Sequence, residues 1–217
     1  MFATYSLGFL IFSLMAHFPL MYNVGFDKNT IWYFLHVICN TLVIYLTYQD
    51  LNICLTDTTE SYNTALFHSS ALGCTFGLHL YHIIISYKTL TIIDWLHHLI
   101  SNVLMVFIGV YYINIPVWNC GNFFMCGLPG GIDYLLLFLT KIKKINRNTE
   151  KYYNVYLNNW LRSPGILYCA LLLHLGYINK QIDASMFVIY MSIFAIVFNA
   201  IYFAERVTIN YGRVTSK

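Results

Sequence analysis

The sequence predicts an all-α protein with about seven transmembrane helices. Hydrophobic residues make up 59% of the 217 residues, charged residues only 10%, and the mean hydropathy is +0.60. Soluble domains, by contrast, are about one-quarter charged. A helix needs about 20 apolar residues to cross about 30 Å of hydrocarbon, and seven stretches of roughly that length are present. The segments between them are short, so residues 1–217 are expected to form a single transmembrane domain.

The seven expected spans follow one another with little between them. The first has no basic segment before it and no small-residue cleavage pattern, so we interpret it as a retained helix and not as a removed signal peptide. The spans lie at about 4–22, 31–49, 64–86, 90–113, 117–140, 157–178 and 185–204.

The positive charges predict an orientation. If the loop 141–162 faces the cytosol and the chain crosses seven times, all of the twelve Lys and Arg residues except Lys180 lie on the cytosolic side. Positive charge accumulates on the cytosolic side of membrane proteins, so the N-terminus is expected to be lumenal and the C-terminus cytosolic. The net charge of +3 is then a property of the membrane topology and not of a nucleic-acid-binding surface.

Polar residues recur at helical spacing inside four of the spans. Such residues are costly in hydrocarbon, so we expect these stripes to face a shared interior. They are His36, Asn40 and Thr47; His68, Thr75, His79, His82 and Ser86; Asp94, His98, Ser101 and Asn102; and Ser185, Ser192, Asn199 and Arg206.

The stretch DWLHHLIS, residues 94–101, is the most specific chemical signal. Asp94 precedes His98 by one helical turn, so its carboxylate is placed to accept the ring N–H, fix the tautomer and raise the basicity of the imidazole. His97 is turned by about 100° from His98. An isolated intramembrane polar residue is often a structural contact between helices, but a carboxylate beside two histidines favours a functional site.

The fifth span contains a second signal. Pro129, Gly130 and Gly131 are expected to interrupt the helix, and broken membrane helices occur where their backbone faces protein or a water-filled cavity. Asp133 would then lie in the first turn of the resumed helix. Two interpretations stay open for it: a carboxylate stabilised by the helix dipole, or a second carboxylate in the cavity of the histidines.

The order of these motifs resembles a known family. GLHLYH in the third span is followed by DWLHH, YYINIP, a fifth span with a proline, and KYYNVYLNNWLRSPGILY after a basic loop. Over residues 30–205 this pattern is similar to the TLC domain of ceramide synthases, translocation-associated membrane proteins and small lipid-related membrane proteins. The chain lacks the complete ceramide-synthase signature, and His82 stands where many small members carry Asp.

The resemblance implies a TLC-type helical barrel around a lipid-accessible cavity that holds His97 and His98. It implies a protein of lipid metabolism and, by analogy with ceramide synthases, N-acyl transfer from acyl-CoA to a long-chain amine. We expect His98 to act as base or nucleophile oriented by Asp94, and His97 as oxyanion donor or CoA contact, with the two histidine roles exchangeable. Asp133 would bind the amine. No bound cofactor is expected, and Lys141, Lys143 and Lys144 would bind the phosphates of acyl-CoA as co-substrate.

The expected substrate cavity adds polar residues from several spans. They are His36, His79, His82, Ser101, Asn102 and Asn199.

Two other functions remain open at this stage. A metal-dependent membrane lipid oxidase would use His79, His82, His97 and His98, although Asp94 replaces the first His of an HxxHH box and further histidine boxes are missing. A lipid-binding or membrane-lipid-homeostasis protein would keep the cavity without turnover. The resemblance alone implies residence in the endoplasmic reticulum or another endomembrane.

Overall fold

The structure is helical throughout the part of the chain that it describes. The computed structural model describes residues 1–63, 65 and 69–216, without the side chain of Ser101; His68, expected on the third stripe, lies outside these residues. The elements are α1 (Phe2–Tyr22), α2 (Lys28–Thr56), η1 (Glu60–Tyr62), α3 (Ser70–Ser86), α4 (Ile92–His97), η2 (His98–Leu104), α5 (Met105–Tyr111), α6 (Pro116–Asn122), η3 (Phe123–Gly127), α7 (Leu128–Lys141), α8 (Arg147–Tyr156), η4 (Leu157–Arg162), α9 (Ser163–Ile178) and α10 (Met186–Thr215).

Consecutive elements join into membrane-length helices. Among the residues that the structure describes, six continuous helices are long and apolar enough to cross a membrane: Phe2–Tyr22, Lys28–Thr56, Ile92–Tyr111, Pro116–Lys141, Arg147–Ile178 and Met186–Thr215. The helix α3 is apolar but shorter, with 17 residues. The prediction of an all-α polytopic membrane protein is therefore confirmed.

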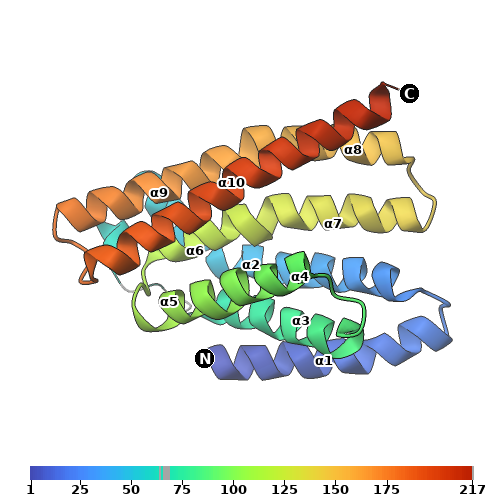
Figure 1. Ribbon diagram of the computed structural model, residues 1–217. Coiled ribbons are helices and arrows are strands. Elements are labelled where there is room, and N and C mark those ends of the chain that lie inside the picture. The colour runs from blue at the N-terminus through green and yellow to red at the C-terminus, as the bar shows by residue number, and fades with distance from the viewer. Residues whose placement is uncertain (64, 66–68, 217) are drawn as a thin grey trace.

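The helices run roughly along one direction, with α9 and α10 side by side (Figure 1). The links from α1 to α2, from α3 to α4 and from α7 to α8 gather at one end of the bundle, together with the C-terminus. The N-terminus lies at the other end. α1 packs mainly on α3, where Gly73 and Gly77 allow the two backbones to approach closely.

Helix starts carry side-chain caps where the sequence supplies them. Asp27 accepts a hydrogen bond from the Thr30 backbone N–H at 2.7 Å at the start of α2, and this bond lowers the pKa of Asp27. Asn146 caps α8 in the same way, through the Thr149 N–H. These caps fix where the helices begin on leaving the loops.

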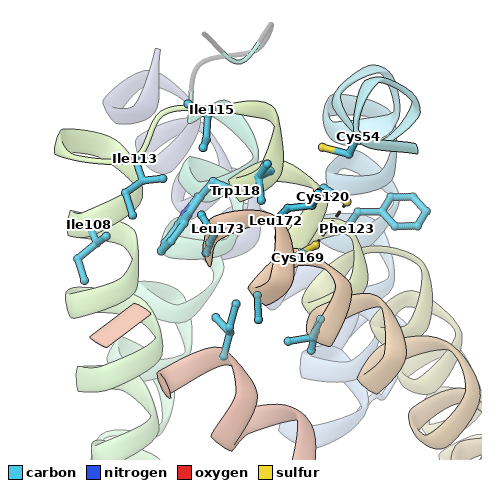
Figure 2. Packing of buried hydrophobic residues seen from close by; sticks show 14 of the residues in the cluster. Cys54, Ile108, Ile113, Ile115, Trp118, Cys120, Phe123, Cys169, Leu172 and Leu173 are labelled. Carbon is cyan, nitrogen blue, oxygen red and sulfur yellow. Dashed lines mark hydrogen bonds between the residues drawn. The ribbon is translucent and has the colours of Figure 1, made fainter. Parts of the chain in front are cut away.

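Apolar side chains from α2, α5, α6, α9 and α10 form the larger buried cluster. Figure 2 shows Trp118, Leu172 and Leu173 packed together, with the thiols of Cys120 and Cys169 facing each other. Their sulfur atoms are 3.5 Å apart, and all six cysteines are free. The cysteines therefore serve as small buried residues in this fold.

Two sequence expectations about helix boundaries are wrong. Residues 147–156, which precede the span expected at 157–178, were expected in a loop but are helical, and only a five-residue link remains between Lys141 and Arg147. The fifth span is not broken at Pro129 either. The π-helical segment η3 ends just before α7, and the helix continues through Pro129 in the first turn of α7 with this wider turn ahead of the proline. Asp133 consequently lies beyond the first turn of α7.

Candidate functional site

A partly open cavity of about 210 Å³ lies inside the bundle. As far as the structure describes the wall, it is lined from the five membrane-length helices after α1 and from α3, and no residue of α1 lines it. The volume is below the roughly 300–1,000 Å³ of sites that enclose a drug-sized ligand. It suits a polar head with its chain continuing toward the membrane.

Five histidines gather at one end of this cavity, from α2, α3, α4 and η2. His98 is 4% exposed and central: its Nδ1 lies 3.2 Å from Nδ1 of His79, and its Nε2 lies 3.2 Å from Nδ1 of His82. The ring of His97 is 5.5 Å from that of His79, centroid to centroid. His36, His79 and His97 line the cavity, so three imidazoles are exposed to a ligand there.

Asn102 contacts the same ring nitrogen of His98 as His79 does. Its side-chain Nδ2 lies 3.4 Å from Nδ1 of His98. A neutral imidazole donates through one ring nitrogen and accepts through the other, so His98 can link a donor on one side with an acceptor on the other. His79, His98 and His82 thus form a chain of imidazoles in which His98 is the link.

Asp94 does not orient His98, contrary to the sequence prediction. The Asp94 carboxylate accepts hydrogen bonds from the backbone N–H and the hydroxyl of Thr91, both at 2.8 Å, and completes a capping box at the start of α4. Its charge still acts on His82 and His98 through space. Asp94 does precede His98 by one helical turn. However, α4 begins so close to Asp94 that the carboxylate binds the capping groups of Thr91 instead of the His98 ring.

Aromatic rings connect the histidines with the opposite end of the cavity. Trp32 lies between His36 and His82, with both ring-centroid distances at 3.9 Å. His36 donates through Nδ1 to the Trp32 carbonyl oxygen at 3.0 Å, because a carbonyl oxygen can only accept. The other face of His36 stacks on Tyr134 at 3.7 Å, and Tyr134 adjoins Asp133 in α7.

A second polar cluster lies around Asp133. Arg162 Nη1 donates to Asn158 Oδ1 at 3.0 Å, and Asn158 Nδ2 donates to Asn154 Oδ1 at 2.5 Å. Asn154 Nδ2 then donates to Asp133 Oδ1 at 2.7 Å. These hydrogen bonds run in one direction from a guanidinium to a carboxylate. Asn154 also donates to Glu150, which pairs with Lys151 at 3.0 Å.

Arg162 and its amide partners were not among the residues expected in the site. The signal in the sequence is a row of polar residues at a step of four: Glu150, Asn154, Asn158 and Arg162. A step of four drifts around an α-helix with 3.6 residues per turn, but η4 is π-helical and wider, which keeps the row on one side. Arg162 therefore lines the cavity instead of lying in a cytosolic loop.

The other expected site residues divide into two groups. His36, His79, Asn102 and Asn199 line the cavity, as the polar stripes predict, and His97 and Asp133, which lie on no stripe, line it as well. His82 reaches the cavity only through His98, and the side chain of Ser101 is not described.

Lys141, Lys143 and Lys144 lie at the end of α7 and in the link after it, outside the cavity wall. Lys141 pairs with Asp27 at 3.7 Å. Since Asp133 precedes Lys141 by eight residues, the basic group lies about 12 Å further along the helix axis.

No described group of three or more His, Cys, Asp or Glu residues has the arrangement needed to hold a metal ion. The two ring nitrogens of His98 point to two different histidines instead of converging on one point with them. Comparisons with protein-family models, with curated proteins and with solved structures find no match to this chain.

Proposed function

We propose that this protein is a membrane-embedded acyltransferase that transfers a long-chain acyl group from acyl-CoA to a long-chain amine. The observation that carries the proposal is the exposure of His79 and His97 to a cavity inside a membrane-type bundle, with His98 linked behind them. Imidazoles in a largely apolar cavity are suited to taking up a proton from an amine or attacking a thioester.

His97 is the better candidate for the reacting group, because it lines the cavity while both nitrogens of His98 contact other histidines. In one route the nitrogen of the amine attacks the thioester carbon, and His97 removes a proton from that amine during the attack. In the other, His97 attacks first and forms an acyl-imidazole that the amine then resolves. In both, the carbon–sulfur bond breaks, an amide bond forms, and the proton from the amine ends on the CoA thiolate.

The imidazole chain can hold that proton until it returns through His97 to the CoA thiolate. His79 lies beside His97 and contacts His98, which contacts His82 near the α3–α4 link. A neutral imidazole accepts a proton at one nitrogen and releases one from the other, so His98 can pass a proton without moving. We assign His98 the role of a relay, and Asn102 that of positioning it.

Asp133 remains the candidate for binding the amine. Only its Oδ1 receives the Asn154 amide, and the residue lines the cavity. Lys141, Lys143 and Lys144 would meet the phosphates of CoA at the end of the bundle where the other basic links gather. If that end faces the cytosol, the N-terminus is lumenal, and the resemblance to the TLC domain favours an endoplasmic reticulum location.

The experiment is a turnover assay on the purified protein in lipid nanodiscs. Free CoA is measured over a panel of acyl lengths and long-chain amines, and the product lipid is identified by mass spectrometry. Wild-type protein should form an amide, and His97→Ala should lower the rate by about 10²-fold or more, the usual contribution of a general base.

The matched control is His174→Ala, because His174 contacts Tyr190 and does not line the cavity. Its rate should equal that of the wild type. No product over the whole panel, with a lipid retained through purification, would replace the proposal with lipid binding without turnover. Equal rates for the His97 and His174 variants would refute the assignment of His97.

A further inference from the structure

We propose that the Arg162 end of the cavity binds the carboxylate of a long-chain amphiphile. This inference concerns binding alone and does not rest on acyl transfer. It starts from two hydrogen-bond donors on residues of the cavity wall: Nε of Arg162 and Nδ2 of Asn122 are buried and have no partner among the described residues. Buried polar groups are nearly always satisfied, so two such donors in one cavity point to a bound acceptor.

The free edge of the Arg162 guanidinium has the geometry of a carboxylate site. Nη1 is taken by Asn158, and the Arg162 side chain lies over the Phe203 ring with 5.9 Å from Cζ to the centroid. These two contacts hold the plane of the guanidinium. The edge that remains has Nε and Nη2, whose N–H groups point the same way and bind both oxygens of a carboxylate at once.

Gly130 leaves space beside that edge. A Cβ added at Gly130 would lie 3.5 Å from Nη2 of Arg162 and 3.1 Å from Nδ2 of Asn40. Asn122, 8% exposed, lines the same cavity from α6. The wall also carries Leu72, Val106 and Ile196, which suit a hydrocarbon chain. Together these groups match a planar anionic head with an apolar tail.

The charges in the cavity favour a carboxylate over a phosphate. Arg162 is the only Lys or Arg among the described residues of the wall, and Asp133 in the same wall carries the opposite charge. A phosphate dianion carries more negative charge than one guanidinium neutralises. It also has a third oxygen, for which one free guanidinium edge has no N–H donor. A single carboxylate uses that edge fully.

The test measures competition for a photoreactive palmitate analogue that cross-links to the protein in nanodiscs. Palmitate should compete, and hexadecanol and hexadecylamine, which have the same chain length, should compete at least about tenfold less well. Hexadecyl phosphate competing more strongly than palmitate would overturn the choice of carboxylate. Equal competition by hexadecanol would show that only the chain is recognised and would also overturn the proposal.

Substitutions in the cavity wall test whether the carboxylate head of palmitate binds at Arg162. Arg162→Lys keeps the positive charge but removes the edge with two parallel N–H groups, and should weaken palmitate binding at least about tenfold. Gly130→Ala keeps every polar group and narrows the space at Nη2, so it tests the site even if Arg162→Lys fails to fold. Asp133→Asn should increase the affinity for palmitate, because it removes a nearby negative charge. Arg206→Lys, at an exposed arginine of α10, is the matched control and should leave binding unchanged.

Unchanged palmitate affinity in both Arg162→Lys and Gly130→Ala would refute the proposal. Weaker palmitate binding in Asp133→Asn would do the same, since it would mean that Asp133 attracts the head. Loss of acyl transfer by itself would not bear on this site, because the competition assay needs no turnover.

Discussion

The amide of Asn154 offers the sharpest test of the second polar cluster. Asn154→Leu keeps the approximate size of the side chain but removes the donor that reaches Asp133 at 2.7 Å and Glu150 at 3.1 Å. It also removes the acceptor of Asn158. Because Asn154 is 6% exposed, water cannot easily replace these hydrogen bonds.

The expected loss can be worked from those contacts. A hydrogen bond to a charged group contributes about 1.5–3 kcal/mol in soluble proteins, whereas hydrogen bonds between membrane helices average about 0.6 kcal/mol and reach about 1.7. Two charged acceptors in a membrane bundle therefore suggest a loss of about 2 kcal/mol. For a chain of this length, that corresponds to a decrease in Tm of about 4–8 °C.

The assay is thermal unfolding in detergent with a thiol-reactive fluorophore, because five of the six free cysteines are buried and react only as the bundle opens. The matched control is Asn159→Leu: Asn159 contacts Thr208 at 3.1 Å in an exposed position, so its loss should change Tm by less than about 2 °C. Equal Tm shifts for the two variants would refute the reasoning.

Three further predictions use the same unfolding assay. Gly77→Ala should cost about 1–3 kcal/mol because the new Cβ would overlap the α1 backbone, whereas Gly212→Ala, with no atom within 4 Å, should be neutral or slightly stabilising. Asp27→Ala should cost about 1 kcal/mol at neutral pH. The Thr30 N–H lowers the folded pKa of Asp27, so this difference should be complete above the unfolded pKa and disappear as the pH falls through the folded one. Thr91→Ala should cost about 1 kcal/mol through loss of the α4 cap, and no loss would contradict the capping box.

Hydropathy was sufficient to predict an all-helical membrane protein, because the cost of exposing backbone groups to hydrocarbon leaves few alternatives to helices. It did not predict the length of each helix: of the seven expected spans, the third corresponds to α3, which has only 17 residues among those the structure describes. It also predicted which stripes face inward, since His36, His79 and Asn199 on three different helices meet at one cavity. The first half of the sixth helix was missed because its charged and amide side chains resemble a loop in composition. Their partners on α7 can be found only when the helices are packed.

The roles inside the histidine cluster were harder to predict. Spacing placed Asp94 one turn from His98 but could not show that Thr91 would begin the helix and bind the carboxylate. The π-helical segment that starts at His98 changes the direction of every side chain after it, and residue spacing at 3.6 per turn cannot foresee that change. The result is that Asn102, and not Asp94, contacts the ring of His98.

The central claim is that His97 acts on an acyl group inside the cavity. The most direct measurement compares the rates of CoA release by His97→Ala and His174→Ala, from one acyl-CoA and one long-chain amine, with both variants shown to unfold at the wild-type Tm. We predict a rate about 10²-fold lower for His97→Ala and a wild-type rate for His174→Ala. Two equal rates, with both proteins folded, would contradict the claim.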